Sequence, residues 1–232
     1  MRIIVFGANG PTGRLLTTQA LAEGHDVTAF VRNPETFPIV HPQLWLAPGD
    51  VLDADDVRWA VAGHDVVLST LGAPFSRAPI AVYSVGGRHL LDAMQAAGVG
   101  RFACVTSSAC ERNPGRTGGL VFDRVVQPLV VNTIGRTVYD DMRRLEELVM
   151  TSELAWTIVR PSGLFDAEGV TAYRVGERHL PARFTSRADL ADCLLRQATD
   201  DTWVRKQVAV ATVEARPSMV QLIWREGIRK SA

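Results

Sequence analysis

Three glycines near the N-terminus follow a short apolar segment at a regular spacing. Gly7, Gly10 and Gly13 recur every third residue in the stretch GANGPTGR. In a phosphate-binding loop the first glycine permits a tight turn, the second lets the backbone approach a pyrophosphate, and the third lets a helix pack closely on a strand. The amide groups at the N-terminus of that helix then face the anion. The stretch therefore predicts a dinucleotide-binding loop rather than a plain glycine-rich turn. Its other members, also candidate cofactor contacts, are Asn9, Pro11, Thr12 and Arg14.

The segment after this loop indicates which nicotinamide cofactor would bind. In such folds a carboxylate at the carboxyl end of the second strand binds the ribose 2′-hydroxyl of NAD, whereas an arginine accommodates the 2′-phosphate of NADP. The stretch DVTAFVR has Asp26 at its start and Arg32 at its end. A guanidinium is always charged and can bind a phosphate through paired hydrogen bonds. The pattern favours NADP(H), with an ordinary surface cation as the alternative interpretation of Arg32.

The elements that must position these residues alternate regularly along the chain. Short apolar, β-branched segments are each followed by a segment of helical periodicity, which is typical of a parallel sheet covered on both faces. The expected fold class is therefore α/β, a doubly wound parallel sheet (Rossmann fold) with helices on both faces, in a single domain. This domain would span residues 1–212, and the sequence assigns no role to the C-terminal extension, residues 213–232. Strands are expected at 3–6, 27–31, 44–47, 66–69, 102–106 and 156–159, and helices at 13–22, 54–62, 80–97, 135–152 and 187–198.

A short repeat supports this order of elements. The tetrapeptide GHDV occurs at residues 24–27 and 63–66, each time between a predicted helix and a predicted strand. Glycine at such a position can adopt the left-handed backbone that ends a helix. His25 and His64 would then lie at the amino-terminal edge of the sheet, opposite the edge where ligands bind. We therefore expect both histidines to be loop residues.

Composition excludes several classes of function. The chain has 25 basic and 25 acidic residues, so no overall positive field would hold a nucleic acid or an anionic membrane. Cys104, Cys110 and Cys193 show no CxxC spacing, which suits a reducing compartment, and the expected location is the cytoplasm. No segment has the length of about 18 apolar residues that indicates a membrane span. No metal-ligand spacing links the histidines and cysteines. A small-molecule substrate is expected, and the oligomeric state stays open.

The basic residues are almost entirely arginine. Of the 25 basic residues only Lys206 and Lys230 are lysines, and both lie near the C-terminus. A mechanism that needs a lysine earlier in the chain is therefore excluded. Phosphate binding by a GxxxxGK[ST] loop, which uses such a lysine, is therefore excluded in this part of the chain.

Several further motifs resemble one known family when they are combined with GANGPTGR. They are VRNP after the second predicted strand, GDVLD at 49–53, STLG at 69–72, VTSSA at 105–109, WTIVRP at 156–161 and SRADLA at 186–191. The combination resembles the atypical short-chain dehydrogenase/reductases of the NmrA-like, NAD(P)H-binding group. Within that group it is most similar to the biliverdin reductase and flavin reductase branch. The resemblance covers residues 1–212.

The resemblance implies a place around the cofactor for each of these motifs. Asp50 and Val51 would meet the adenine, and Thr70, Leu71 and Gly72 would lie along the ribose and pyrophosphate. Thr106 and Ser107 would lie beside the nicotinamide, flanked by Pro161 and Ser162. All of these residues lie at the carboxyl ends of predicted strands, and the carboxyl edge of an open α/β sheet is where ligands bind.

The sequence departs from the wider superfamily at the expected catalytic pair. Standard members use a tyrosine and, four residues later on the same helix, a lysine that lowers the pKa of the phenol. Here Arg143 lies four residues after Tyr139, and the carboxylates of Asp140 and Asp141 would oppose ionisation of the phenol. Arginine cannot release a proton to a relay. Ser107 is therefore the first candidate for a catalytic hydrogen-bond donor, and Tyr139 is the second.

The expected function is NADPH-dependent hydride transfer to a small conjugated or aromatic acceptor, such as a flavin, a quinone or a carbonyl compound. The proton would come from solvent or from Ser107. Two other classes stay open, because one fold supports many functions. One is an NmrA-like redox sensor that binds the dinucleotide without turnover, and the other is a non-redox cyclase or isomerase. The apolar segment 120–131 is expected either to line a substrate pocket or to belong to the core or a subunit interface.

Overall fold

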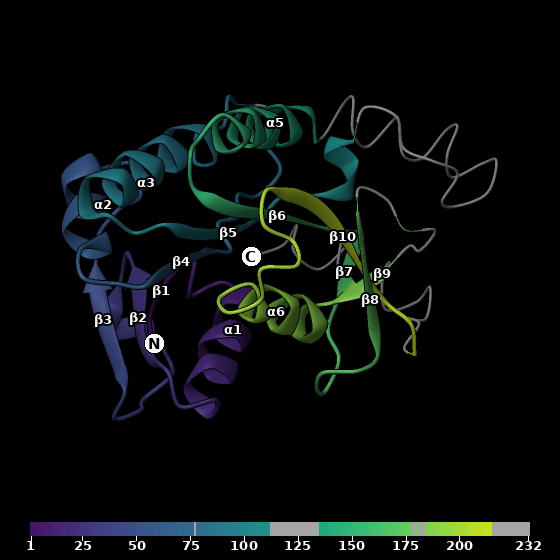
Figure 1. Cartoon of the computed structure of the whole chain (residues 1–232), viewed down its shortest axis with the longest axis horizontal. Coiled ribbons are helices and arrows are strands. Elements are labelled where there is room, and N and C mark those ends of the chain that lie inside the picture. The colour runs from purple at the N-terminus through teal and green to yellow at the C-terminus, as the bar shows by residue number, and fades with distance from the viewer. Residues whose placement is uncertain (77, 112–134, 178–179, 181–183, 215–232) are drawn as a thin grey trace.

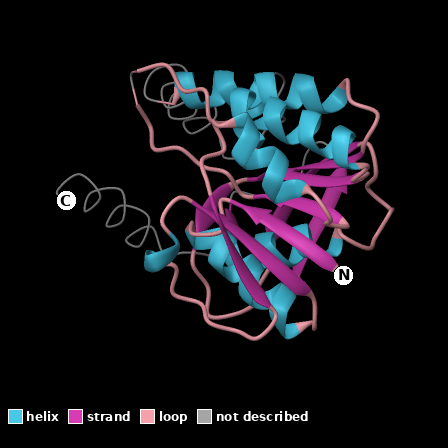
Figure 2. Cartoon of the chain, turned by 90° about the vertical axis from the view of Figure 1, so that its left-hand side faces the viewer, coloured by secondary structure: helices cyan, strands magenta, loops and turns pink. Residues whose placement is uncertain are grey.

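The computed structural model describes residues 1–76, 78–111, 135–177, 180 and 184–214. Within these residues, an eight-stranded sheet lies between two layers of helices (Figures 1 and 2). The strand order is β3-β2-β1-β4-β5-β6-β10-β8, and every neighbouring pair is parallel except β10 with β8. The predicted doubly wound α/β fold is confirmed.

The bounds of the elements are close to those expected up to residue 161. The strands of the large sheet are β1 (Arg2–Phe6), β2 (Asp26–Val31), β3 (Leu44–Pro48), β4 (Val66–Ser69), β5 (Arg101–Val105), β6 (Ala155–Pro161), β8 (Tyr173–Glu177) and β10 (Lys206–Thr212). The helices are α1 (Pro11–Ala22), α2 (Ala54–Val61), α3 (Ser84–Ala97), α5 (Arg136–Met150) and α6 (Arg187–Arg196). Two single turns of 3₁₀-helix are η1 (Pro34–Thr36) and η2 (Ser108–Cys110), and a separate parallel pair is formed by β7 (Gly163–Phe165) and β9 (Phe184–Ser186).

One edge of the sheet departs from the parallel arrangement. β8 runs antiparallel to β10, and neither of these strands nor the β7–β9 pair was expected from the sequence. β8 lies at the end of the sheet and its residues are only partly buried, so its sequence lacks the continuous apolar run of a central parallel strand.

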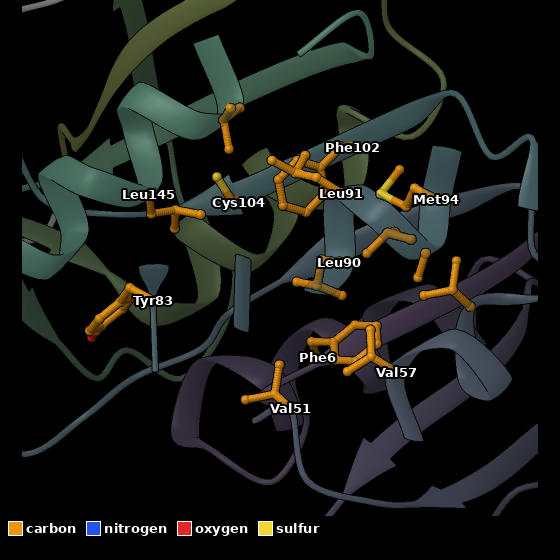
Figure 3. Close-up of a cluster of buried hydrophobic side chains, with 14 of the residues drawn as sticks. Phe6, Val51, Val57, Tyr83, Leu90, Leu91, Met94, Phe102, Cys104 and Leu145 are labelled. Atoms are coloured by element: carbon orange, nitrogen blue, oxygen red, sulfur yellow. The ribbon is translucent and has the colours of Figure 1, made fainter. Parts of the chain in front are cut away.

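Each face of the sheet carries its own hydrophobic core. The α2, α3 and α5 helices cover one face, and α1 and α6 cover the other (Figure 1). Ile4 and Phe6 of β1 belong to the first core, whereas Ile3 and Val5 belong to the second. Successive residues of a strand point to opposite faces, which explains why β1 is apolar at every position from residue 3 to residue 6. Figure 3 shows Phe6 in the first core, close to Val57 and Leu90.

None of the helices within the described residues has the length and apolar character that a membrane crossing requires.

The order of the strands reverses at β1, and such a reversal predicts a ligand-binding crevice at the carboxyl end of this strand. β2 pairs with one side of β1 and β4 pairs with the other, so the connections that leave β1 and β4 diverge at this point. Open α/β sheets bind ligands beyond the carboxyl ends of the strands where the order reverses in this way. The segments after β1 to β6 therefore meet at one edge of the sheet.

The opposite edge contains the GHDV repeats. Gly24 and Gly63 have φ values of 79° and 81°, which confirms the left-handed turns expected at these positions. His64 lies near the start of β4, and its Nε2 is 2.8 Å from Thr28 Oγ1. Burial lowers the pKa of this imidazole, so the side chain is neutral at neutral pH and serves as a structural hydrogen-bonding group.

The α3 helix begins four residues later than the predicted residue 80, and a carboxylate from another helix caps it. Asp141 of α5 is fully buried, and its Oδ2 accepts hydrogen bonds from the backbone amides of Tyr83 at 2.9 Å and Ser84 at 3.3 Å. Its Oδ1 accepts a hydrogen bond from the hydroxyl of Ser84. A helix start needs acceptors for its first amide groups. Asp141 provides them from outside the α3 segment, and so fixes α3 to α5.

Replacing Asp141 with alanine would leave these buried donors without acceptors. We expect the free energy of unfolding, measured by urea denaturation, to fall by about 2–4 kcal/mol. The control is Asp55→Ala on α2, whose side chain is 87% exposed and pairs with Arg58. That change should cost less than about 1 kcal/mol. Equal losses in the two variants would contradict a capping role for Asp141.

Candidate functional site

The turn after β1 brings three backbone segments into close contact. Gly7 has a φ of 75°, and a Cβ atom on it would lie 2.6 Å from the carbonyl carbon and oxygen of Thr70. A Cβ on Gly13 would lie 2.2 Å from the carbonyl oxygen of Gly7. The Gly10 amide donates a 3.0 Å hydrogen bond to the same oxygen, which closes the turn. Side chains at Gly7 or Gly13 would therefore prevent this approach of α1 to the sheet.

The N-terminus of α1 is open to an anion. Gly10 is its capping residue and provides no side-chain acceptor, Pro11 is the first helical residue, and the first turn has no acidic side chain. The amide groups of Thr12 and Gly13 therefore face the crevice without a side-chain cap, in a field that favours negative charge. This arrangement fits a pyrophosphate, and the binding of one at this loop stays a prediction.

Basic and polar side chains gather beside this turn. Arg14 donates hydrogen bonds from Nε at 3.0 Å and from Nη2 at 2.7 Å to Oδ1 of Asn9. The Asn9 amide lies 3.4 Å from the hydroxyl of Thr36, in η1, just after β2. Arg32 follows β2 directly, is exposed, and forms no ion pair with any residue that the structure describes. Asn9 thus links the glycine turn to the segment that carries Arg32.

The ends of β3 and β4 form the next part of the crevice. The carboxylate of Asp50 accepts a 3.0 Å hydrogen bond from Leu52 N, and its own amide donates to Asp56, so Asp50 lies in a fixed turn. Val51 is buried in the core and its methyl groups face Gly86. Of the two residues expected at the adenine, Asp50 is thus the more accessible.

Thr70 connects β4 to the glycine turn. Its hydroxyl lies 3.1 Å from the carbonyl of Phe6 and 3.2 Å from that of Gly7, and donates to both. Leu71 packs partly on the core, whereas Gly72 is exposed and a Cβ atom on it would meet no other atom within 4 Å. Of the three residues expected at the ribose and pyrophosphate, Gly72 is therefore the most exposed.

Behind the ends of β5 and β6 lies a buried ion pair that sequence inspection missed. Arg160 of β6 donates to both carboxylate oxygens of Glu146 in α5, from Nε at 2.8 Å and from Nη2 at 2.6 Å. Its Nη1 donates to Glu111 at 2.9 Å. Burial acts to lower the pKa of Arg160, and the hydrogen bonds and negative charge of Glu146 outweigh it, so the pKa is raised. A basic residue at the end of the apolar run WTIV is a signal that a buried partner exists, although its identity cannot be read from the pattern.

The Arg160–Glu146 ion pair also engages the hydroxyl of Thr106. The hydroxyl of Thr106 donates a 2.7 Å hydrogen bond to Oε1 of Glu146, and its amide donates to the carbonyl of Val159. The side chain is buried, so its hydroxyl is a structural donor rather than a free one. Pro161 is also buried and ends β6 beside it.

Ser107 is the half-buried hydroxyl at this end of the crevice. It caps η2, because its Oγ accepts a hydrogen bond from Ala109 N at 3.2 Å. An oxygen that accepts this bond still has its own hydrogen to donate. The hydroxyl hydrogen of Ser107 can therefore be donated to a ligand, whereas that of Thr106 is already donated to Glu146.

Tyr139 and Arg143 occupy the positions of the expected catalytic pair on α5. The ring of Tyr139 packs against Phe75, with ring centroids 6.0 Å apart. Arg143 donates to Asp140 and to the carbonyls of Ala109 and Cys110. The guanidinium therefore contacts the η2 segment.

The cysteines are buried and unpaired thiols. Burial raises the pKa of Cys110 and Cys193 to about 12 and raises that of Cys104 further, so all are protonated at neutral pH. None has the thiolate character of a nucleophile. Among the described residues, no group of histidine, cysteine and acidic side chains could hold a metal ion. The apolar segment 120–131 and the C-terminal residues from 215 onward lie outside the described residues.

Comparison with known proteins identifies the family. A family model described as NAD(P)H-binding matches residues 7–201, which include the strands from β2 to β9 and the segments that form the crevice. The chain belongs to this NAD(P)H-binding family. The expected membership in an NAD(P)H-binding family is confirmed.

Curated relatives of this NAD(P)H-binding protein include 3-beta-hydroxysteroid dehydrogenases of mycobacteria. One from Mycolicibacterium neoaurum is 27% identical over 189 residues, which is 75% of this chain and 50% of the relative. A 3 beta-hydroxysteroid dehydrogenase/Delta 5→4-isomerase from Mycobacterium tuberculosis is 37% identical over 119 residues, 47% of this chain and 32% of the relative. The chain thus spans half or less of the length of these proteins.

Solved structures share the fold along almost the whole chain. A short-chain dehydrogenase/reductase from Veillonella parvula, in complex with NADP, has a TM-score of 0.77 at 17% identity and covers 94% of this chain and 99% of its own. ChuY, an anaerobillin reductase from Escherichia coli O157:H7, has a TM-score of 0.75 at 22% identity and covers 94% of this chain and 100% of its own. At these identities the match establishes the fold.

The contact between Gly13 and Gly7 makes the glycine turn testable. Gly13→Ala would place a methyl group on the Gly7 carbonyl, so the N-terminus of α1 must move away from the anion. We expect the dissociation constant for NADPH, measured by fluorescence titration, to rise at least about tenfold, the equivalent of one lost charge-assisted hydrogen bond. Gly100→Ala is the control, because a Cβ there meets no atom within 4 Å. An unchanged affinity for NADPH in Gly13→Ala would show that the pyrophosphate does not bind at this turn.

Proposed function

We propose that this NAD(P)H-binding protein is an NADPH-dependent reductase of a small conjugated or aromatic acceptor, such as a flavin, a quinone or a carbonyl compound. One observation carries the proposal: the open N-terminus of α1, the exposed Arg32 and the half-buried Ser107 all follow the carboxyl ends of strands of one sheet. The relatives named as a dehydrogenase and as a reductase support a redox reaction.

The preference for NADPH rests on Arg32 together with Arg14. NADP carries a 2′-phosphate on the adenosine ribose. The exposed Arg32 follows β2, the strand whose carboxyl end carries the ribose-binding residue in dinucleotide-binding folds. Asn9 holds the guanidinium of Arg14 through two hydrogen bonds and connects it to the segment after β2. No acidic side chain takes the place of Arg32 at the end of β2. A ribose 2′-hydroxyl would therefore lack its usual carboxylate partner.

The chemistry at the other end of the crevice needs one proton donor. NADPH, when bound, supplies a hydride, which adds two electrons to the acceptor. The acceptor then takes one proton at its neighbouring oxygen or nitrogen. The Ser107 hydroxyl has a free hydrogen and is held by η2, so it can donate a hydrogen bond to that atom or position a water molecule. Because serine is a weak acid, solvent replaces the proton. Holding hydride donor and acceptor in line contributes the larger part of the rate.

A redox sensor is the second candidate. The observation that favours it is the commitment of both Thr106 and Arg143 to protein partners, which leaves few strong donors beside the nicotinamide. Such a protein would bind NADPH tightly, and none of the acceptors would oxidise the bound NADPH.

Arg32→Ala tests the choice of cofactor. Loss of a charged contact with the 2′-phosphate should raise the dissociation constant for NADPH at least about tenfold and change that for NADH less than about twofold. Arg58→Ala on the exposed surface of α2 is the matched control and should change neither constant. Equal losses for the two cofactors in Arg32→Ala would contradict the role of Arg32 in selecting NADPH.

Turnover with a panel of acceptors tests the reaction. NADPH oxidation is followed by fluorescence with FMN, menadione, an aromatic aldehyde and a 3-ketosteroid. At least one acceptor should be reduced, and Ser107→Ala should lower kcat for it about 10-fold to 100-fold with an unchanged KM for NADPH. The neighbouring Ser108→Ala is the matched control. Tight NADPH binding without oxidation by any acceptor would favour the sensor. Failure to bind NADPH or NADH would contradict both the reductase and the sensor.

A further inference from the structure

The guanidinium of Arg143 is bonded on all three nitrogens to groups other than a phenol. Nη1 donates to Oδ1 of Asp140 at 2.8 Å, Nη2 donates to the carbonyl of Ala109 at 3.2 Å, and Nε donates to the carbonyl of Cys110 at 3.3 Å. The two carbonyls belong to η2, the single turn that directly follows Ser107. Arg143 therefore joins the middle of α5 to the turn that holds the candidate donor.

The same turn is held at both of its ends by the buried ion pair. Before it, the hydroxyl of Thr106 donates to Glu146 at 2.7 Å, and after it, Glu111 accepts from Arg160 at 2.9 Å. Glu146 and Arg160 are themselves joined by two hydrogen bonds and are almost fully buried. Residues 106–111 are thus attached to rigid elements at the start, in the middle and at the end.

We propose, on the basis of the function proposed above, that Arg143 is a positioning residue for the Ser107 turn and does not replace the lysine of a Tyr-Lys pair. Its planar group carries donors in a fixed fork, which suits two neighbouring carbonyls and a carboxylate at once. A lysine at this position carries its donors on a single nitrogen and lacks this planar fork. The proton-handling group of this site is then placed on the turn after β5, and α5 provides its support.

Thiol alkylation tests this role without cofactor or acceptor. Cys110 lies in the turn, is 2% exposed, and its carbonyl is one of the two that Arg143 binds. N-ethylmaleimide labelling is measured by peptide mass spectrometry in the full chain and in Arg143→Lys. Loss of one or two hydrogen bonds from a charged donor should raise the rate at Cys110 about tenfold through local opening. Cys104 and Cys193 lie in other elements, are 0% and 1% exposed, and should keep their slow rates as internal controls.

Two outcomes of the labelling would overturn the proposal. An unchanged rate at Cys110 in Arg143→Lys would show that Arg143 does not hold the turn. An equal rise at all three cysteines would show that Arg143 stabilises the fold as a whole. Arg144→Lys is the matched control on the same helix, because Arg144 is 64% exposed and approaches Asp141 only at 3.8 Å. Failure of the proposed reaction would leave this readout unaffected.

Turnover gives the second readout, because Arg143→Lys recreates the Tyr-x-x-x-Lys spacing. We expect kcat with the best acceptor to fall about tenfold and the KM for NADPH to change less than about twofold, since misplacing a reacting group affects the chemical step. A retained kcat in Arg143→Lys would contradict the positioning role, and an increased kcat would indicate instead that the cation acts on Tyr139.

Discussion

The arrangement of the crevice depends on the close approach of three backbone segments at the end of β1. A Cβ at Gly13 would overlap the carbonyl of Gly7, and a Cβ at Gly7 would overlap the backbone of Thr70. This contact sets the N-terminus of α1 beside the sheet, and the Thr70 hydroxyl binds the carbonyls of Phe6 and Gly7 from the other side. The positive end of the helix and the ends of two strands consequently share one small region, which is the requirement for binding a pyrophosphate through backbone groups.

The second half of the crevice is built on buried charge. Two charges away from water are costly unless each is paired and hydrogen-bonded. Arg160 and Glu146 meet this condition, and their remaining hydrogen-bonding capacity extends to Thr106 and Glu111. Such a fully connected network holds its members in one geometry, because any displacement leaves a charge without its partner. The turn that carries Ser107 lies between Thr106 and Glu111, so the network also fixes the position of this turn.

The arginine-rich composition has structural consequences at several of these positions. Arg160 and Arg143 each bind several acceptors through one planar group, which a lysine cannot do. Arg32, in contrast, is exposed and makes no ion pair among the described residues, so its charge is available to a ligand. The same residue type thus serves as internal support beneath the predicted nicotinamide end and as a candidate ligand contact at the predicted adenine end. Because no lysine precedes residue 206, the turn of the candidate proton donor Ser107 is held by arginine side chains instead.

Local sequence determined the elements from β1 to β6, the glycine turn and the left-handed Gly24 and Gly63, because apolar periodicity and glycine geometry act over a few residues. The contacts of Ser107, Arg32 and the other site residues with a cofactor stay predictions. Only the tertiary structure decided that β8 is antiparallel, that Asp141 caps α3, and that Arg160 pairs with Glu146. Each of these depends on groups far apart in the chain. A single carboxylate or guanidinium has the same local pattern whichever partner it meets, so the packing of the elements selects the partner.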